Sequence, residues 1–323
     1  MKHLLGRQLA AACAALVLVC ALGVANAADT LAESPGWYRA QIGRVTVTAL
    51  WDGTLDMPVD KVFARPGPAP LKALLARARV PATMALSVNA FVVDTGQRVV
   101  MIDTGTGASR AFGDRLGKVG ANLRAAGYAP EQIDEIYITH MHTDHIGGLT
   151  LEGRAVYPNA IVRADARESG HYLSPAKRAA AGDEKSDFDA AVATLDPYVK
   201  SGRFKPFDGR TELVAGIVTA LPAPGHTPGH TVYQVESDGE RLVLWGDLMH
   251  VAPVQFPLPA ATVAFDWMQP QAAASRARIY REVARDGGAW VAAAHIGFPG
   301  IGKISAEPGG SYRWLPMALI RGR

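Results

Sequence analysis

The chain has 323 residues, with 33 lysines and arginines against 30 aspartates and glutamates. This near balance of charge gives no basic surface of the kind that nucleic acids or acidic membranes bind, so it argues against both classes of partner. The length fits one large α/β domain or two smaller ones, and no linker or shift in composition indicates two.

The first 27 residues have the pattern of a secretory signal peptide. Basic residues near the start are followed by an apolar stretch over residues 9–24 and by the small-x-small sequence Ala25-Asn26-Ala27. Both cysteines lie in this segment, so residues 28–323 have no disulfide and no thiol nucleophile. Without its two basic residues the formal net charge falls from +3 to +1. We therefore expect a periplasmic or secreted protein, with residues 28–323 as one domain and no membrane contact after cleavage.

Hydrophobic periodicity and turn residues predict the secondary structure. Strands are expected at residues 45–50, 87–93, 98–102, 135–139, 160–163, 217–221, 231–236, 241–245 and 290–294. Helices are expected at residues 71–78, 114–126, 165–173, 186–198 and 271–285. Strands come in groups and helices fall between the groups. This order predicts an α/β fold, a four-layer αββα sandwich of two mixed sheets flanked by helices.

The most informative feature is a short polar run directly after the strand predicted at 135–139. It places three of the nine histidines and one aspartate within six residues, as His140, His142, Asp144 and His145. Imidazole and carboxylate are ligands that zinc and similar divalent ions prefer. The run therefore indicates a metal site at the end of a strand rather than a polar surface loop.

The spacing within this run favours two ions, because four ligands on one loop do not fit comfortably around one tetrahedral ion. Each ion then needs ligands from elsewhere, and three candidates each follow a predicted strand: His226, Asp247 and His295. The alternative interpretations are a turn histidine for His226, a capping aspartate for Asp247 and a core histidine for His295. We expect these loops to gather at one edge of the sheets.

Together these motifs resemble the metallo-β-lactamase-fold hydrolases, in order and spacing over nearly all of residues 28–323. Further segments are similar to the methyl parathion hydrolase-like and lactonase branch of that superfamily: Leu244-Trp245-Gly246-Asp247, Val254-Gln255-Phe256-Pro257, His295-Ile296-Gly297-Phe298-Pro299-Gly300 and Tyr312-Arg313-Trp314-Leu315-Pro316. The resemblance implies the αββα fold and, as in many members, a homodimer.

The resemblance also implies an arrangement of ligands. One ion takes His140, His142 and His226, the other takes Asp144, His145 and His295, and Asp247 and a hydroxide bridge them. We expect zinc, with cobalt, manganese or iron as alternatives. The bridging hydroxide would attack a carbonyl or phosphoryl centre, and Asp144 would pass a proton to the leaving group.

Several other residues are predicted near the site. Asp103 is expected as a buried acid beside the ligands rather than a ligand, and His171 as a helix-surface residue. His230 either holds a ligand in place or only begins a strand. By position in the family, these residues are expected to line a substrate pocket: Phe112, Tyr172, Phe188, His250 and Phe265.

The sequence leaves the substrate open. A bulky pair at His250 and Phe265 would leave less room for a tetrahedral phosphotriester than for a flat ester, which favours hydrolysis of lactones or aryl carboxylic esters. A phosphotriesterase on the same site is the alternative. A β-lactamase is disfavoured by Asp247, which the best-known β-lactamases of this fold lack. A mononuclear iron sulfur dioxygenase and a non-catalytic metal-binding protein are the remaining hypotheses.

Overall fold

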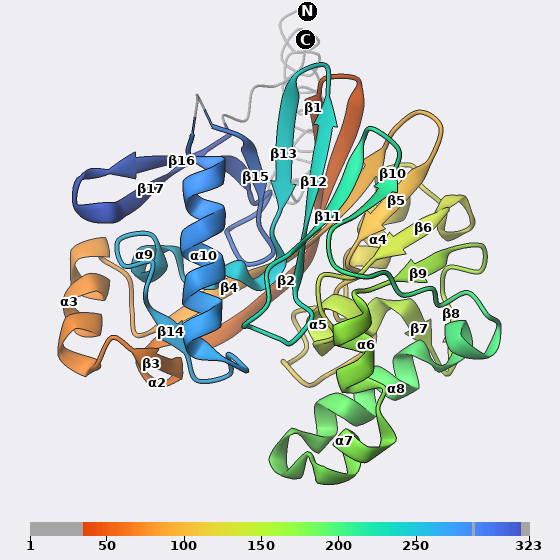
Figure 1. Ribbon diagram of the computed structural model, residues 1–323, viewed down its shortest axis with the longest axis horizontal. Coiled ribbons are helices and arrows are strands. Elements are labelled where there is room, and N and C mark those ends of the chain that lie inside the picture. The colour runs from red at the N-terminus through yellow and green to blue at the C-terminus, as the bar shows by residue number, and fades with distance from the viewer. Residues whose placement is uncertain (1–34, 286–287, 318–323) are drawn as a thin grey trace, which may run out of the picture. The chain divides into compact units, whose positions relative to one another are not determined.

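A computed structural model describes residues 35–285 and 288–317 of the chain (Figure 1). The predicted signal peptide, its cleavage site and both cysteines lie outside the described residues. Within the described part of the chain, no helix combines the length and the apolar character that crossing a membrane requires.

The first large sheet has six strands in the order β1-β2-β4-β5-β6-β9. Their bounds are β1 Trp37–Ile42, β2 Val45–Pro58, β4 Thr83–Asp94, β5 Val99–Ile102, β6 Glu135–Tyr137 and β9 Ile161–Arg163. The strands from β1 to β5 pair antiparallel, whereas β5, β6 and β9 run parallel, so the sheet is mixed. The Asp94-Thr95-Gly96 turn joins β4 to β5, as predicted. Asp94 stabilises this turn by accepting a hydrogen bond from the Gly96 N–H at 2.8 Å.

The second large sheet has seven strands in the order β10-β11-β12-β13-β15-β16-β17. Their bounds are β10 Thr211–Val214, β11 Val218–Pro222, β12 Thr231–Ser237, β13 Glu240–Leu244, β15 Trp290–Ala292, β16 Ile301–Glu307 and β17 Ser311–Pro316. β12 lies antiparallel to both β11 and β13, and β15 pairs parallel to β13. The carboxyl ends of β11, β13 and β15 therefore lie at the same edge of this sheet.

The remaining elements are the helices, two small sheets and five 3₁₀ turns among the described residues. The helices are α2 Val59–Val62, α3 Pro68–Ala78, α4 Val119–Ala125, α5 Thr143–Ile146, α6 Ala166–Tyr172, α7 Pro175–Ala180, α8 Lys185–Lys200, α9 Ala252–Gln255 and α10 Gln269–Val283. Two small sheets pair β3 (Phe63–Arg65) with β14 (Thr262–Val263) and β7 (Thr150–Leu151) with β8 (Arg154–Ala155). Single 3₁₀ turns occur at Pro130–Gln132, Gly147–Leu149, Gly182–Glu184, Gly246–Leu248 and Pro308–Gly310.

Three buried clusters define the layers. Side chains such as Phe91 of β4 and Tyr233 of β12 fill the space between the two large sheets. Leu123 of α4 and Leu195 of α8 cover the outer face of the first sheet, and Ile279 of α10 covers that of the second (Figure 1). The predicted four-layer αββα sandwich is confirmed.

Two of the predicted elements differ most from the observed bounds. The helix expected from residue 114 begins only at Val119, because Gly117 takes a left-handed φ of 89° and Asp52 accepts a hydrogen bond from the Val119 N–H at 3.1 Å. The strand expected to end at residue 50 continues to Pro58 as β2, through an irregularity between Trp51 and Gly53. The final hairpin of β16 and β17 was not predicted.

Candidate metal centre

The predicted ligands all lie on loops that directly follow strands of the two large sheets. The run from His140 to His145 follows β6 and contains the one-turn helix α5. His226 follows β11, Asp247 follows β13 and His295 follows β15. Because β11, β13 and β15 share a direction, three separate parts of the sequence deliver their polar side chains to one place.

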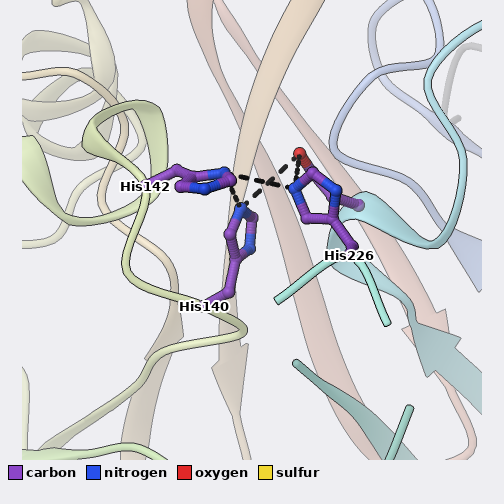
Figure 2. A group of neighbouring side chains, drawn as sticks. His140, His142 and His226 are labelled. Carbon is purple, nitrogen blue, oxygen red and sulfur yellow. Dashed lines mark hydrogen bonds and ion pairs between the residues drawn. The ribbon is translucent and has the colours of Figure 1, made fainter. Parts of the chain in front are cut away.

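His140, His142 and His226 form the first cluster, and Figure 2 shows their rings pointing toward one another. Nε2 of His140 lies 3.0 Å from Nδ1 of His142, which lies 3.2 Å from Nε2 of His226. Oδ2 of Asp247 completes a group of four donor atoms, at 3.6 Å from His140 and 3.4 Å from His226.

Asp144, His145 and His295 form the second cluster. Oδ2 of Asp144 lies 3.4 Å from Nε2 of His145 and 3.5 Å from Nε2 of His295. Oδ1 of Asp247 lies 3.1 Å from the same nitrogen of His145 and 3.0 Å from that of His295. The Asp247 carboxylate therefore contributes one oxygen to each cluster.

The spacing of these atoms fits divalent ions. Tetrahedral bonds of about 2.0–2.1 Å place neighbouring donor atoms about 3.3–3.4 Å apart, and both clusters lie close to that value. Nε2 of His145 and Oδ1 of Asp247 are buried and have no hydrogen-bond partner among the described residues. Buried polar atoms are normally paired, so these two atoms are arranged to bind something other than protein.

Each of the five cluster histidines turns its outer ring nitrogen toward an oxygen atom. The pairs are His140 Nδ1 with Thr139 Oγ1 (3.1 Å), His142 Nε2 with Tyr172 Oη (3.1 Å), His145 Nδ1 with Asp103 Oδ2 (2.8 Å), His226 Nδ1 with Asp266 Oδ1 (3.0 Å) and His295 Nδ1 with the Ser87 carbonyl oxygen (2.9 Å). A proton on each outer nitrogen leaves the inner nitrogen with a free lone pair, which is the tautomer that a metal ligand needs.

Asp103 connects two of these histidines. It accepts hydrogen bonds from the backbone N–H of Thr139 at 2.8 Å and from the Thr139 hydroxyl at 2.7 Å, besides its contact with His145. The Thr139 hydroxyl is then free to accept from His140. Asp103 adopts a left-handed φ of 60° to reach this position, and it lies beside the clusters rather than in them.

His230 contacts the backbone of Asp247. Its Nδ1 faces the Ala223 carbonyl oxygen at 3.1 Å, and its Nε2 accepts a hydrogen bond from the Asp247 N–H at 3.0 Å. Gly246 has a left-handed φ of 52°, and a Cβ there would lie 2.9 Å from His230 Nε2 and 2.8 Å from Thr139. Glycine at this position therefore allows the turn that brings Asp247 to the clusters.

In the absence of an ion, the histidines of the two clusters differ among themselves in proton affinity. Burial lowers the pKa of His140, and it lowers that of His142 to about 3. Burial opposes the charge of His145 too, but the surrounding carboxylates, Asp247 first, outweigh it and raise the pKa well above the usual value. Burial would raise the pKa of Asp247, yet the nearby histidines, His145 first, hold it well below its usual range. In the first cluster, burial likewise opposes the charge of His226, but its carboxylate neighbours, Asp247 first, outweigh it and raise the pKa to about 9. Metal binding is therefore expected to displace protons from His226 and from the second cluster.

Two supporting residues were not predicted from the sequence. Asn89 on β4 donates hydrogen bonds from Nδ2 to the carbonyl oxygens of Ala293 (3.0 Å) and Ile296 (2.8 Å), and so fixes the loop that carries His295. Asp266 lies on the loop before α10 and contacts His226. Neither belongs to a motif, and only the fold brings them to the site.

A cavity of about 300 Å³ opens onto both clusters. Its apolar wall is formed by Leu55, Met57, Leu86, Phe112 and Phe265. His250 also lines it, with Nε2 3.0 Å from Oδ2 of Asp247. Of the residues predicted for a substrate pocket, Phe112, His250 and Phe265 thus line this cavity.

Three other predicted positions need correction. Phe188 is 2% exposed and packs in the core, so it does not form the cavity wall. Tyr172 is buried, and its hydroxyl is directed to His142. His171 was expected on a helix surface, but it is 9% exposed and its ring lies against Tyr172, Phe188 and Trp267. The cause is the packing of α6 against α8, which the sequence pattern of α6 does not reveal.

Comparison with known proteins gives matches over much of the chain. Residues 83–284 match the family model described as the metallo-beta-lactamase superfamily, a range that includes every predicted ligand except His295. A probable metallo-hydrolase of Mycobacterium tuberculosis is 27% identical over 183 residues, which cover 50% of this chain and 56% of that protein. An N-acyl homoserine lactonase of Bacillus cereus is 24% identical over 176 residues, which cover 49% of this chain and 62% of that protein. The chain thus spans somewhat more than half the length of these curated relatives.

Solved structures match over a longer range. The hydrolase AbOPH, described as in the beta lactamase superfamily, has a TM-score of 0.84 and 32% sequence identity, and the match covers 90% of this chain and all of that one (100%). AidC, a dizinc quorum-quenching lactonase in complex with the product N-hexanoyl-L-homoserine, has a TM-score of 0.79 and 26% identity, with 88% of this chain and 99% of that chain covered.

Proposed function

Because the chain belongs to the metallo-beta-lactamase superfamily, we propose that it is a hydrolase with two divalent metal ions that opens lactones or cleaves aryl carboxylic esters. The observation that carries this proposal is the shared carboxylate. Asp247 gives one oxygen to each of two four-atom clusters, at the floor of a cavity with an apolar wall. The similarity to a dizinc lactonase supports both the ion count and the substrate class.

The chemistry divides between the ions and the side chains. When bound, the two ions would lower the pKa of a shared water from about 15.7 toward about 7 and polarise the substrate carbonyl. Asp247 holds the two ligand clusters at a fixed separation, and His230 and Gly246 fix Asp247. Leu55, Met57 and the other apolar wall residues exclude bulk water and hold the apolar part of the substrate.

Asp144 is proposed to transfer a proton to the leaving group. It belongs to the second cluster and also lines the cavity, with 7% of its surface exposed. Its Oδ2 faces His145 and His295, and the residue can be reached from the cavity, as a proton donor to the substrate must be. Asp144→Asn should lower kcat even at a zinc concentration that keeps both ion sites filled. Full activity with both ions bound would exclude this role.

The size of the cavity supports a flat substrate. The rings of His250 and Phe265 meet edge to face with centroids 5.0 Å apart, directly on the wall of the 300 Å³ cavity. A lactone or aryl ester presents a planar carbonyl group, whereas a phosphotriester presents three substituents around a tetrahedral centre. We therefore propose phosphotriester hydrolysis only as the second candidate function.

The test is metal analysis of the mature protein together with a substrate panel. The panel contains a dihydrocoumarin-type lactone, an aryl ester, a paraoxon-type triester and a β-lactam, with His226→Ala as the matched inactive control. We expect two ions per chain and the highest kcat/KM on the lactone or the aryl ester.

Other outcomes would replace the proposal by a named alternative. A single iron per chain without hydrolysis would point to the sulfur dioxygenase, and full occupancy with no turnover on any substrate to a non-catalytic metal-binding protein. Highest activity on the triester or the β-lactam would assign those reactions instead.

We also propose that the chain is exported and cleaved after Ala27, as the sequence pattern predicts. Sequencing the amino terminus of protein recovered from the cell envelope or the medium tests this. A first residue of Ala28 is expected, and retention of Met1 would contradict it.

A further inference from the structure

Glu168 on α6 is a buried acid that the proposed chemistry does not use. Its side chain is 0% exposed, and its two carboxylate oxygens accept hydrogen bonds from two different loops. Oε1 accepts from the Met141 N–H at 2.8 Å, and Oε2 accepts from the Gly229 N–H at 2.8 Å. When Glu168 is ionised, both are hydrogen bonds to a charged acceptor, which are stronger than those between neutral groups.

The two loops carry the three imidazoles of the first cluster. Met141 lies between His140 and His142, and Gly229 follows His226 on the loop after β11. The carboxylate of Glu168 therefore joins the backbone of one ligand loop to the backbone of the other. The second cluster is built differently, because Asp144 and His145 lie on α5 and His295 follows β15.

Gly229 shows how closely the second loop approaches α6. A Cβ on Gly229 would lie 2.3 Å from the backbone nitrogen of Glu168 and 2.6 Å from its Cβ. Real side chains do not approach backbone atoms so closely, so any other residue would push the loop away from α6. Gly229 and Glu168 together set the distance between the loop of His226 and the loop of His140.

Burying a carboxylate in this position costs desolvation free energy, which an apolar side chain would not cost. Burial is the largest effect on Glu168, and in the absence of an ion it raises the pKa to about 7 despite the backbone donors. A buried acid contributes little net stability even when it is well paired. A role in holding ligands explains its presence better than a role in the core does.

We propose that Glu168 is a positioning residue, which holds the loops of His140, His142 and His226 at the separation that one metal ion requires. It sets the affinity of the first cluster and leaves that of the second nearly unchanged. This inference rests on the proposed two-ion site.

The test measures zinc affinity by competition with a chromophoric chelator, so it does not depend on activity. Glu168→Gln keeps the size of the side chain but turns an amide N–H₂ toward one of the two backbone donors. We expect one of the two ions to bind about 10–100-fold more weakly, as for other residues that hold a ligand in place. Crystals of the variant grown with limiting zinc should show the remaining ion between Asp144, His145 and His295.

Asp165 provides the matched control. It is also a buried acid at α6, where it caps the helix by accepting from the Arg167 N–H at 2.8 Å. Asp165→Asn should lower the free energy of unfolding without changing the zinc affinity of either cluster. Gly229→Ala is an independent variant that should weaken the same ion as Glu168→Gln, and it replaces that variant if Glu168→Gln does not fold.

Two results would overturn the inference while leaving the proposed function intact. One is wild-type affinity for both ions in Glu168→Gln or Gly229→Ala. The other is an equal weakening of both ions that Asp165→Asn reproduces, since this would show a general effect of α6 stability. Wild-type protein that binds fewer than two ions would instead contradict the proposed function itself.

Discussion

Asp266 holds His226 by a contact of 3.0 Å between its Oδ1 and the imidazole Nδ1. The backbone reinforces this contact, because the next residue, Trp267, donates its N–H to the His226 carbonyl oxygen at 3.0 Å. The residue before Asp266 is Phe265, which forms part of the cavity wall. The loop that shapes the cavity is therefore the same loop that orients a metal ligand.

This relationship predicts the effect of removing Asp266. Asp266→Ala should weaken zinc binding or activity about 10–100-fold, because the ring of His226 loses the acceptor that fixes its tautomer. Asp266→Asn retains an acceptor oxygen, so its loss of zinc affinity or activity should be much smaller. Chelator competition on both variants measures this, and equal losses would show that the negative charge matters rather than the hydrogen bond.

Asp247 should be the most sensitive single position. Asp247→Asn replaces one of the two shared oxygens by an amide nitrogen, which cannot act as a ligand in the same way. Losing a residue that only holds a ligand in place weakens metal binding about 10–100-fold. We expect the zinc affinity of at least one cluster to fall by more than this in Asp247→Asn. Zinc titration followed by calorimetry would show this, and two ions with wild-type affinity would contradict the shared-ligand arrangement.

Metal removal should lower stability as well as activity. An ion that binds the folded protein at 100 times its Kd stabilises it by about 2.7 kcal/mol. The melting temperature should therefore fall when a chelator is added and recover when zinc is restored. His226→Ala should show a smaller response than wild type, and a response equal to wild type would mean that the stabilising ion binds elsewhere.

The pKa of Glu168 predicts a pH dependence in the metal-free protein. Burial raises this pKa from 4.5 to about 7, so the folded protein binds more protons than the unfolded chain between these values. The contribution of Glu168 to stability is fully present below about pH 4.5, and about 3 kcal/mol is lost as the pH rises through about 7. In urea denaturation with chelator present, Glu168→Gln should lose less stability than wild type between pH 5 and pH 8. Parallel profiles would exclude a raised pKa.

A smaller side chain at Phe265 should change the substrate preference. Phe265 is 40% exposed at the mouth of the cavity, so Phe265→Ala removes wall area with little effect on the core. The ratio of kcat/KM for a triester to that for a lactone should rise, because the tetrahedral substrate gains room. An unchanged ratio would show that this wall does not select the substrate. Zinc content serves as the control, since Asp266 is the adjacent residue.

The sequence predicted the layers well because they depend on local pattern, and the ligand motifs are recognisable in it for the same reason. Alternating apolar residues marked the strands, and the dense run from His140 to His145 indicated metal. The predicted start of a helix at residue 114 was wrong, because Asp52, far away in the sequence, fixes the start of α4 at Val119.

The supporting residues show the limit of such a prediction. Glu168 is one acid within a helical pattern, and Asn89 is one polar residue within an apolar strand, so neither differs locally from an ordinary residue. Their importance comes from the loops that the fold places beside them. The expectation that Phe188 lines the cavity failed for the same reason, because burial against α6 depends on packing between helices.

The distribution of the ligands along the chain gives the ions a mechanical role. His142 and His226 lie 84 residues apart in the sequence, and β6 and β11 belong to different sheets. An ion held by both would close a long loop, as a disulfide does, and in the chain-entropy model closing a loop of about 100 residues stabilises a protein by about 4.7 kcal/mol. The sequence has no cysteine after position 20. The metal centre would thus serve this chain as its reversible cross-link, which forms and opens with the supply of metal rather than with redox conditions.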